Sequence, residues 1–557
     1  MGQSTVTKFA EELGLPVDLL IEQLKSAGVN KSAPQDSLTE VDKSALLEYL
    51  RKEHGQSQAP KNKITLTHKQ NKEIKKTDST GRARTIQVEV RKKRVLVRRE
   101  DGQPVDTLIE KPKPIGYEDI KPYYDKIDQL IGVFGTNEGL ENDPDGYFLP
   151  PPKPRLHELM IRKGAIQSGV KVIPSRLSIL TKAIKNDAGR GVCFYCGQCN
   201  RNCSYAKADF SSTNVLIFPA LATGNVDLIT NAMVREVLTN KEGLATGVSY
   251  VNKIDLSEHQ VRGRVVILGA SACESARLLL NSISARHPNG LANSSNIVGK
   301  YLHDSTGAAM GGILPSLFGR KRYNEDGVGG AHIYSPWWLD NKKLDFPRGY
   351  HIEYWGGMSQ PSYGFHWGIE SLNGKYLVKG VKKDAGGYGA SLKEDYRYFY
   401  GCGVGMAGRG EAIPLASNYC AIDPQKVDRY GIPVLKFHVK WSEHEINQAR
   451  HMKETFKEIM HNMGAVVTWG ADDGPHNNWG LSKPGEIIHE AGTVRMGDNP
   501  KYAVLNKWSQ AHDCKNLFCV DGGQFVSQAD KNITWTILAL SMRASEYIID
   551  QLKKNQL

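Results

Sequence analysis

Four cysteines lie close together in GVCFYCGQCNRNCSYAK, and their spacing is a strong local sign of site chemistry. They are Cys193, Cys196, Cys199 and Cys203, in the order C-x2-C-x2-C-x3-C. Thiolates at this spacing are typical ligands of an iron–sulfur cluster, although Ser204 stands where a proline is usual. A structural zinc site more often divides into two CxxC pairs separated by a dozen or more residues. The pattern favours a cluster, with zinc or purely structural thiols as alternatives.

A glycine pattern, GVGMAG, matches a second kind of chemistry. Gly403, Gly405 and Gly408 fit G-x-G-x-x-G, which binds the diphosphate of a dinucleotide when a strand precedes it and a helix follows. The next residues are RGEAIPLAS, where Pro414 and the lack of an apolar period argue against a helix. We interpret this match as a coincidental glycine cluster.

Most of the net positive charge of the chain comes from one stretch, residues 61–100. The net charge is +12, and residues 61–100 hold fourteen Lys or Arg against four Asp or Glu, a local net charge of +10. Such a stretch can bind phosphates through counterion release, but charge alone favours a solvated tether. No apolar run is long enough to span a bilayer and the first residues lack a secretory signal, so we expect a cytoplasmic chain.

Apolar periodicity predicts a small helical module at the start of the chain. Residues 4–52 contain three short amphipathic stretches, separated by Gly14 and Gly28. Thr39 and Asp42 approximate a capping box at the start of the third stretch. No catalytic grouping is visible in this module.

From Pro114 onward the pattern becomes that of a mixed α/β protein. The stretch 115–135 is amphipathic and helix-like, and 224–251 predicts strands around a Lys-Glu-Gly turn. An apolar strand at 265–268 leads through a glycine into a helix, which is half of a βαβ unit and favours a parallel sheet. Residues 331–400 are rich in aromatics and glycine with little helical period, which predicts an antiparallel sheet.

Residues 1–100 resemble the N-terminal region of bacterial translation initiation factor two. The phrases FAEELGLPVDLLIEQLKSAG, KITLTHKQ and RARTIQVEVRKKR occur in the order of that region, but the P-loop of the factor is absent. The resemblance implies a helical module over 1–52 and a basic linker over 53–113. A contact with RNA or the ribosome through 61–100 would follow from it.

Residues 114–557 resemble the glucose–methanol–choline (GMC) family of flavin-dependent oxidoreductases. The matching phrases are YEDIKPYYDK, ESARLLLNS, PNGLANSSNIVGKYLHD, GEAIPLASN, HEAGTVRMG and NLFCVDGGQFVSQADKNITWTILALSMRASEYI. The resemblance implies an α/β fold with a partial FAD-binding parallel-sheet domain over 114–304, which carries the cysteine-rich insert. An antiparallel substrate-binding sheet would follow over 305–417 and a C-terminal segment over 418–557. The whole chain is therefore expected to be a chimera of two unrelated families.

The GMC resemblance implies a chemistry and its catalytic residues. The family oxidises the CH–OH group of an alcohol by passing hydride to the flavin while a histidine takes the hydroxyl proton. His489 opens the HEAGT phrase where the family keeps that base, and Asn532 falls where it keeps the hydrogen-bonding partner. An iron–sulfur cluster would imply a dehydrogenase that passes electrons to a cytochrome or a similar acceptor.

The same resemblance implies which residues contact FAD. The tight turn at Asp521 and Gly522 is expected to bring backbone N–H groups to the diphosphate and ribityl chain, and Val234 to meet the adenine. Asn532 and Thr534 would begin a helix whose N-terminus points at the isoalloxazine and stabilises negative charge there.

The substrate is expected to be a sugar, a polyol or another small alcohol. Aromatic side chains crowd residues 334–367 and could stack on a sugar, although a core of the antiparallel sheet explains them equally well. They are Trp337, Trp338, Tyr354, Trp355, Tyr363, His366 and Trp367.

One part of the family pattern is missing. No strand–G-x-G-x-x-G–helix unit precedes Ile115, and neither does the early glycine-rich flavin loop of the family. The FAD-binding domain is therefore expected to be truncated. The alternative function is an initiation-factor-derived module, associated with RNA or the ribosome, that carries a catalytically inactive flavoenzyme remnant.

Overall fold

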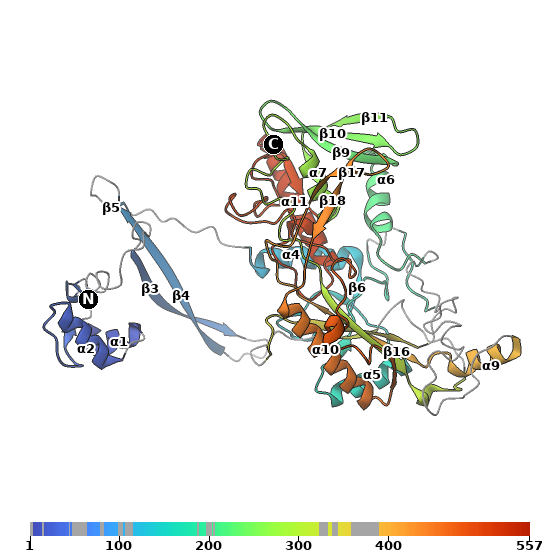
Figure 1. The fold of residues 1–557 in the computed structure, drawn as a ribbon, viewed down its shortest axis with the longest axis horizontal. Helices are drawn as coiled ribbons and strands as arrows, with labels where there is room; N and C mark the ends of the chain where they lie inside the picture. The colour runs from blue at the N-terminus through green and yellow to red at the C-terminus, as the bar shows by residue number, and fades with distance from the viewer. Residues whose placement is uncertain are drawn as a thin grey trace. The chain divides into compact units, whose positions relative to one another are not determined.

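The computed structural model describes residues 4–13, 16–39, 41–43, 45–46, 64–77, 83–98, 104–105, 115–185, 189–195, 203, 206–321, 332–336, 344–357 and 389–557. The chain divides into two compact units, Met1–Lys113 and Pro114–Leu557, which are described separately (Figure 1). Among the described residues, no helix combines the length and the apolar character needed to cross a membrane.

The first unit begins with a helical module. Helices α1 (Val6–Leu13) and α2 (Val17–Ser26) are followed by helical residues at 41–43 and 45–46. The capping box forms as expected, because Asp42 Oδ2 accepts from Thr39 N at 2.8 Å and Thr39 Oγ1 accepts from Asp42 N at 3.2 Å. The buried core consists of Val6, Ala10, Leu20, Leu24, Val29, Leu38 and Leu46.

The module also contains a strand pair that the sequence did not predict. Strands β1 (Ser4–Thr5) and β2 (Ser37–Leu38) pair in antiparallel fashion. Two-residue strands are too short to produce an alternation that can be recognised in a sequence.

The basic stretch forms a long hairpin in the structure rather than an unstructured tether. Strands β3 (Ile64–Thr77) and β4 (Ala83–Arg98) are antiparallel, and the short β5 (Pro104–Val105) pairs with the end of β4. The alternation of β-branched residues in TIQVEV is the strand signal that the charge of this segment obscured.

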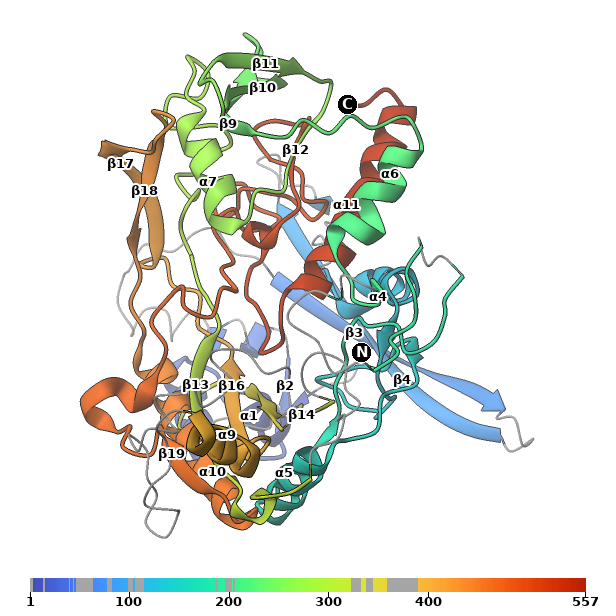
Figure 2. The ribbon, with the colours of Figure 1, turned by 90° about the vertical axis from the view of Figure 1, so that its right-hand side faces the viewer.

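A six-stranded antiparallel sheet forms the centre of one part of the second unit. Its order is β19 (Val466–Trp469), β13 (Thr306–Ile313), β16 (Gly403–Gly410), β15 (Tyr350–Gly356), β14 (Ile333–Ser335) and β8 (Ile173–Pro174). Helices α10 (Glu443–Asn462) and α5 (Leu156–Gln167) lie together beside this sheet (Figure 2). Met452, Phe456 and Ile459 of α10 are fully buried in the shared core. The predicted antiparallel sheet is therefore present.

The glycine cluster GVGMAG lies within β16, in the interior of this sheet. It pairs with β13 on one side and β15 on the other, and it does not form a turn that leads into a helix. A Cβ atom at Gly405 would lie 2.3 Å from Nε1 of Trp355, and one at Gly408 would lie 2.5 Å from Sδ of Met452. The match to the dinucleotide motif is thus coincidental, and these glycines make room for neighbouring side chains.

The segment 331–400, which was predicted to be an antiparallel sheet, also contains a helix. Residues Gly389–Phe399 form α9, within the region where little helical period was recognised. Leu392, Tyr396 and Phe399 have the i, i+4, i+7 spacing of a helix face, and Phe399 packs against the core. The surrounding aromatic and glycine-rich composition masked this short helix.

The other part of the second unit contains the strand–turn–helix unit. Strand β12 (Val266–Leu268) pairs in parallel with β20 (Leu517–Cys519), and α7 (Ala272–Asn281) follows β12. Among the described residues, no third strand joins this pair. Ile267 is 50% exposed, whereas its neighbours on the strand are buried. Phe518, which pairs with Ile267 and shares its face, is fully buried, so the exposure is confined to Ile267.

The remaining elements surround this pair. Strands β9 (Ala232–Thr239) and β10 (Ala245–Asn252) are the strands predicted around the Lys-Glu-Gly turn, and β11 (Glu258–Arg262), which was not predicted, pairs with β10 to complete an antiparallel sheet. Helix α4 (Tyr117–Ile131), also predicted, packs against α11 (Thr534–Lys553). The second unit also contains β6 (Val133–Phe134), β7 (Phe148–Leu149), α6 (Phe218–Ala222), β17 (Tyr419–Val427) and β18 (Pro433–His438), and the last two pair in antiparallel fashion. A π-helical turn at Thr213–Ile217 and 3-10 turns at Pro315–Leu317, Pro475–Gly480 and Gly522–Gln524 complete them.

Candidate active site

The HEAGT segment, residues 489–493, lies between two other parts of the chain. His303 and Ala491 exchange backbone hydrogen bonds of 3.1 and 2.8 Å, which form an antiparallel bridge. On the other side, Gly492 N donates to the Gly522 carbonyl at 3.2 Å. The antiparallel register around the bridge at 303 and 491 brings Ser305 opposite His489. Segments nearly two hundred residues apart thereby build one site.

His489 is held by hydrogen bonds at both its backbone and its ring. Its backbone N donates to Asp304 Oδ1 at 2.8 Å, and its ring Nδ1 lies 3.0 Å from Ser305 Oγ. Burial lowers the pKa of His489, and the negative charges of Asp304 and Glu353 only partly oppose that effect. The imidazole is therefore neutral at pH 7, which is the state that a general base requires.

Strands β15 and β16 contribute charged residues to the same site. Glu353 of β15 lies 3.4 Å from His351 Nε2 and 3.5 Å from Arg409 Nε, measured from its carboxylate oxygens. Burial opposes ionisation of Glu353, but hydrogen bonds from His351 and Asn532 and the Arg409 charge hold its pKa at about 2. His351 Nδ1 also contacts the carbonyl oxygen of Asp530. The large sheet thus places a carboxylate among the residues of the HEAGT site.

The two predicted catalytic residues meet through this carboxylate. Asn532 is exposed, and its side chain helps to lower the pKa of Glu353, whose charge in turn acts on His489. His489 and Asn532 are therefore parts of one electrostatic environment, with Glu353 linking them.

The predicted flavin turn is present, and the Asp521 side chain shapes it from within. Asp521 is buried, and its carboxylate accepts from Ser275 Oγ at 2.5 Å and from Gly523 N at 2.8 Å. A Cβ atom at Gly522 would lie 2.9 Å from the Glu490 carbonyl oxygen. The turn thus packs directly under the HEAGT segment, and the Asp521 carboxylate is occupied within the protein.

The other two predicted cofactor residues lie in different places. Thr534 is the exposed first residue of α11, whereas Val234 is a half-buried residue of β9, paired with Tyr250. Val234 belongs to the separate three-stranded sheet, so the structure does not bring it together with His489.

Several donor groups around the turn fit the isoalloxazine side of FAD. Helix α11 begins after Ile533, and no side chain caps its N-terminus. Gln524 is completely buried, and its amide nitrogen has no hydrogen-bond partner within the described residues. Uncapped helix N–H groups and an orphaned amide suit a ligand rich in acceptor atoms. The diphosphate side lacks its expected sequence unit, so the fit covers one part of the cofactor.

The cysteine prediction falls largely outside the described residues. Cys196 and Cys199 are among the residues that the structure does not describe, while Cys193 and Cys203 are half-buried. Within the described part of the chain, no group of three His, Cys, Asp or Glu side chains could hold a metal ion.

Two of the predicted aromatic residues lie in the described part of the chain, and one of them belongs to the core. Tyr354 is buried and its hydroxyl lies 2.7 Å from Ser335 Oγ, while Trp355 stacks on Trp469 with ring centroids 6.5 Å apart. The core interpretation is therefore supported for Tyr354, whereas Trp355 is half-buried and its stacking partner Trp469 is 42% exposed. The other five lie outside the described residues: Trp337, Trp338, Tyr363, His366 and Trp367.

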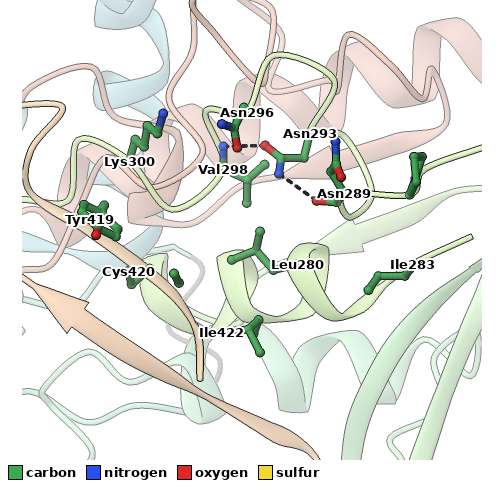
Figure 3. A pocket seen from close by; sticks show the side chains of 12 residues that line it. Leu280, Ile283, Asn289, Asn293, Asn296, Val298, Lys300, Tyr419, Cys420 and Ile422 are labelled. Carbon is green, nitrogen blue, oxygen red and sulfur yellow. Dashed lines mark hydrogen bonds between the residues drawn. The ribbon is translucent and has the colours of Figure 1, made fainter. Parts of the chain in front are cut away.

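A cavity of about 330 Å³ lies away from these residues, between α7, the loop that follows it and β17 (Figure 3). Leu280, Val298 and Ile422 give it apolar walls, and Asn293 adds a polar side. None of the predicted catalytic or cofactor residues lines it. It is therefore separate from the candidate active site.

Sequence reasoning missed several residues of the site. Ser305, Gln528 and Arg409 were not singled out, because their relation to His489 depends on pairing between distant segments. His351 and Glu353 carried a recognisable signal, since two polar residues spaced by two on a strand share one face.

Comparison with protein families identifies the class of each part of the chain. Models of the GMC oxidoreductase family match residues 155–306 and 414–541. A model of the translation initiation factor IF-2 N-terminal region matches residues 1–53, and one of the bacterial IF-2 associated region matches 61–99. The chain therefore belongs to the GMC oxidoreductase family and carries IF-2 regions at its N-terminus, as expected of a chimera.

Individual relatives agree with this assignment. The chain is 30% identical over 440 residues to 2-methyl-1,2-propanediol dehydrogenase of Mycolicibacterium austroafricanum, covering 78% of this chain and 74% of the relative. Its fold is similar to the crystal structure of pyridoxine 4-oxidase from Mesorbium loti, with a TM-score of 0.50 and 13% identity. That alignment covers 86% of this chain and 88% of the other.

Proposed function

We propose that the chain is an FAD-dependent oxidoreductase that acts on the CH–OH group of a small alcohol, sugar or polyol. The observation that carries the proposal is the buried, neutral His489 beside Ser305 and the Asn532–Glu353 pair. The GMC family membership and the similarity to a diol dehydrogenase support the same class of substrate.

The residues of the chain have distinct roles in this proposal. FAD would supply the hydride-accepting ring system. His489 takes the hydroxyl proton of the substrate, and Asn532 orients the substrate oxygen by hydrogen bonding. The turn at Asp521 and Gly522, together with the Thr534 end of α11, would hold the cofactor through backbone N–H groups.

The first test is the visible absorption spectrum of the purified chain, before and after excess FAD is added. Flavin bands that remain after desalting are expected if the retained part of the cofactor site is sufficient. A chain that stays colourless would contradict the proposal, because no hydride acceptor would then be bound.

Replacement of His489 tests whether this residue is the catalytic base. His489→Asn is expected to lower turnover of an alcohol by about a hundredfold to ten-thousandfold, the usual contribution of a general base. The matched control is His476→Asn, an exposed histidine outside the site, and it should retain full turnover. Equal activity of both variants would exclude His489 as the base.

We also propose that the four cysteines hold an iron–sulfur cluster that passes electrons to a cytochrome or similar acceptor. The C-x2-C-x2-C-x3-C spacing of these cysteines supports it. Iron and acid-labile sulfide should be present in stoichiometric amounts and should fall in a Cys196→Ser variant. Zinc without sulfide would contradict a cluster.

A second function is supported for the N-terminal unit by a separate observation. Both IF-2 regions are present in order, and the second of them accounts for most of the net positive charge of the chain. We propose that this unit binds RNA or the ribosome, independently of any flavin chemistry in the second unit.

A further inference from the structure

The amide of Gln528 has only one orientation that suits its fixed neighbours. Its nitrogen can donate to the His489 carbonyl at 2.7 Å, while its oxygen accepts from Ser305 N at 2.8 Å. The opposite orientation would place the amide oxygen against a carbonyl oxygen and the amide nitrogen against a backbone N–H. Backbone groups cannot exchange their donor and acceptor roles, so they determine the orientation of the amide.

The amide orientation in turn determines the role of the serine hydroxyl. Gln528 Oε1 lies 2.7 Å from Ser305 Oγ. An amide oxygen only accepts, so the Ser305 O–H must donate to it. Ser305 is completely buried and Gln528 is 1% exposed, so bulk water does not compete for these groups.

The hydroxyl then determines which ring nitrogen of His489 carries the proton. With its own hydrogen directed at Gln528, Ser305 Oγ can only accept from His489 Nδ1, which lies 3.0 Å away. The neutral imidazole therefore has its hydrogen on Nδ1 and a lone pair on Nε2. Three side chains form a directed chain, from His489 through Ser305 to Gln528.

We infer that Ser305 and Gln528 are positioning residues, which hold the ring proton of neutral His489 on Nδ1 and leave Nε2 to accept the substrate proton. The catalytic meaning of this inference rests on the proposed function, whereas the position of the proton can be measured without any cofactor. Without the relay, Ser305 could donate to Nδ1, and Nε2 would then carry a hydrogen and could not act as a base.

The test is nitrogen-15 NMR of the ring nitrogens in the full chain labelled at histidine, recorded at about pH 8 so that His489 is neutral. The His489 signals are assigned by their loss in His489→Asn. We expect a protonated, pyrrole-like Nδ1 and an unprotonated, pyridine-like Nε2. A protonated Nε2 in the unsubstituted chain would overturn the inference.

Two variants separate the relay from a general effect on folding. Gln528→Leu should move the proton of His489 to Nε2, because the Ser305 hydroxyl loses its acceptor, whereas Gln528→Glu should leave it on Nδ1. His512 serves as an internal reference for intact structure, since its Nε2 lies 2.9 Å from the Gly497 carbonyl and must carry a hydrogen. An unchanged Nδ1 proton in Gln528→Leu, with His512 unaltered, would overturn the relay.

The inference and the proposed function can fail separately. If the His489 proton lies on Nδ1 in the unsubstituted chain but His489→Asn keeps full turnover, His489 is not the base and the relay still stands. If turnover requires His489 but its proton lies on Nε2, the relay is wrong and His489 is still the base.

Discussion

His489 is surrounded by groups that act on its charge in opposite directions. Burial and the Arg409 charge favour the neutral ring, whereas the carboxylates of Asp304 and Glu353 favour the protonated ring. The net effect is a lowered pKa, so the neutral form persists to lower pH than for an exposed histidine. A reaction that uses His489 as a base should accordingly slow only in acid. The midpoint of its pH–rate profile should lie below the ordinary pKa of histidine.

Removing the Glu353 charge should lower the pKa of His489 further. Glu353→Gln keeps the shape of the side chain but removes one of the two carboxylates that favour the imidazolium. The change is measured by NMR titration of the His489 ring, with Glu242→Gln in an exposed turn as control. A raised midpoint in Glu353→Gln would contradict the electrostatic role described for this residue.

At the scale of the elements, two glycines of β16 should differ in their tolerance of a methyl group. Gly405 faces the rigid indole of Trp355, whereas Gly408 faces the flexible thioether of Met452. Gly405→Ala should lower the free energy of unfolding by about 1–3 kcal/mol through overpacking, and Gly408→Ala by less. Urea unfolding of both variants tests this order, and the reverse order would contradict the packing argument.

One buried carboxylate links the start of α5 to His332, the residue that precedes β14. Glu158 is 1% exposed, and it accepts from Arg155 N, Arg155 Nη2 and His332 N, each at 2.7 Å. Burial opposes ionisation, but the Arg155 hydrogen bonds and charge hold the pKa of Glu158 at about 2. The folded-state pKa lies below the unfolded value, so this stabilisation is present above about pH 4.5 and disappears as the pH falls towards 2.

Glu158→Gln should therefore destabilise the chain by roughly 3 kcal/mol at neutral pH. The difference in unfolding free energy between Glu158→Gln and the unsubstituted chain should shrink between about pH 4.5 and 2, where Glu158 itself becomes protonated. Chemical denaturation at several pH values measures it, with Glu141→Gln at an exposed site as control. A pH-independent difference would show that the lost shape of the network, and not its charge, is responsible.

At the scale of the whole molecule, the two units should behave independently. Deletion of Met1–Lys113 is expected to leave thermal unfolding of Pro114–Leu557 unchanged and to abolish RNA binding. In the full chain, binding should weaken with salt, with a slope of about −0.7 per neutralised phosphate for single strands. Replacing Arg91, Lys92, Lys93 and Arg94 by Gln should reduce that slope. Salt-independent binding would contradict an electrostatic contact.

The sequence predicted those features that reside in contiguous phrases. The two family resemblances, the helix α4, the β12–α7 unit and the coincidental nature of GVGMAG all follow from local patterns. The relay from His489 to Gln528 could not be predicted, because its members come from three distant segments and an antiparallel bridge between residues 303 and 491 brings the first two together. Helix α9 was missed because its short apolar period lies within an aromatic and glycine-rich region.

Half-exposed Ile267 is an apolar side chain of the β12–β20 pair that water can reach, whereas its register partner Phe518 is fully buried. A single exposed apolar side chain is ordinary on a protein surface. A polar residue should therefore be tolerated at position 267, while the same change at Phe518 would remove buried apolar surface.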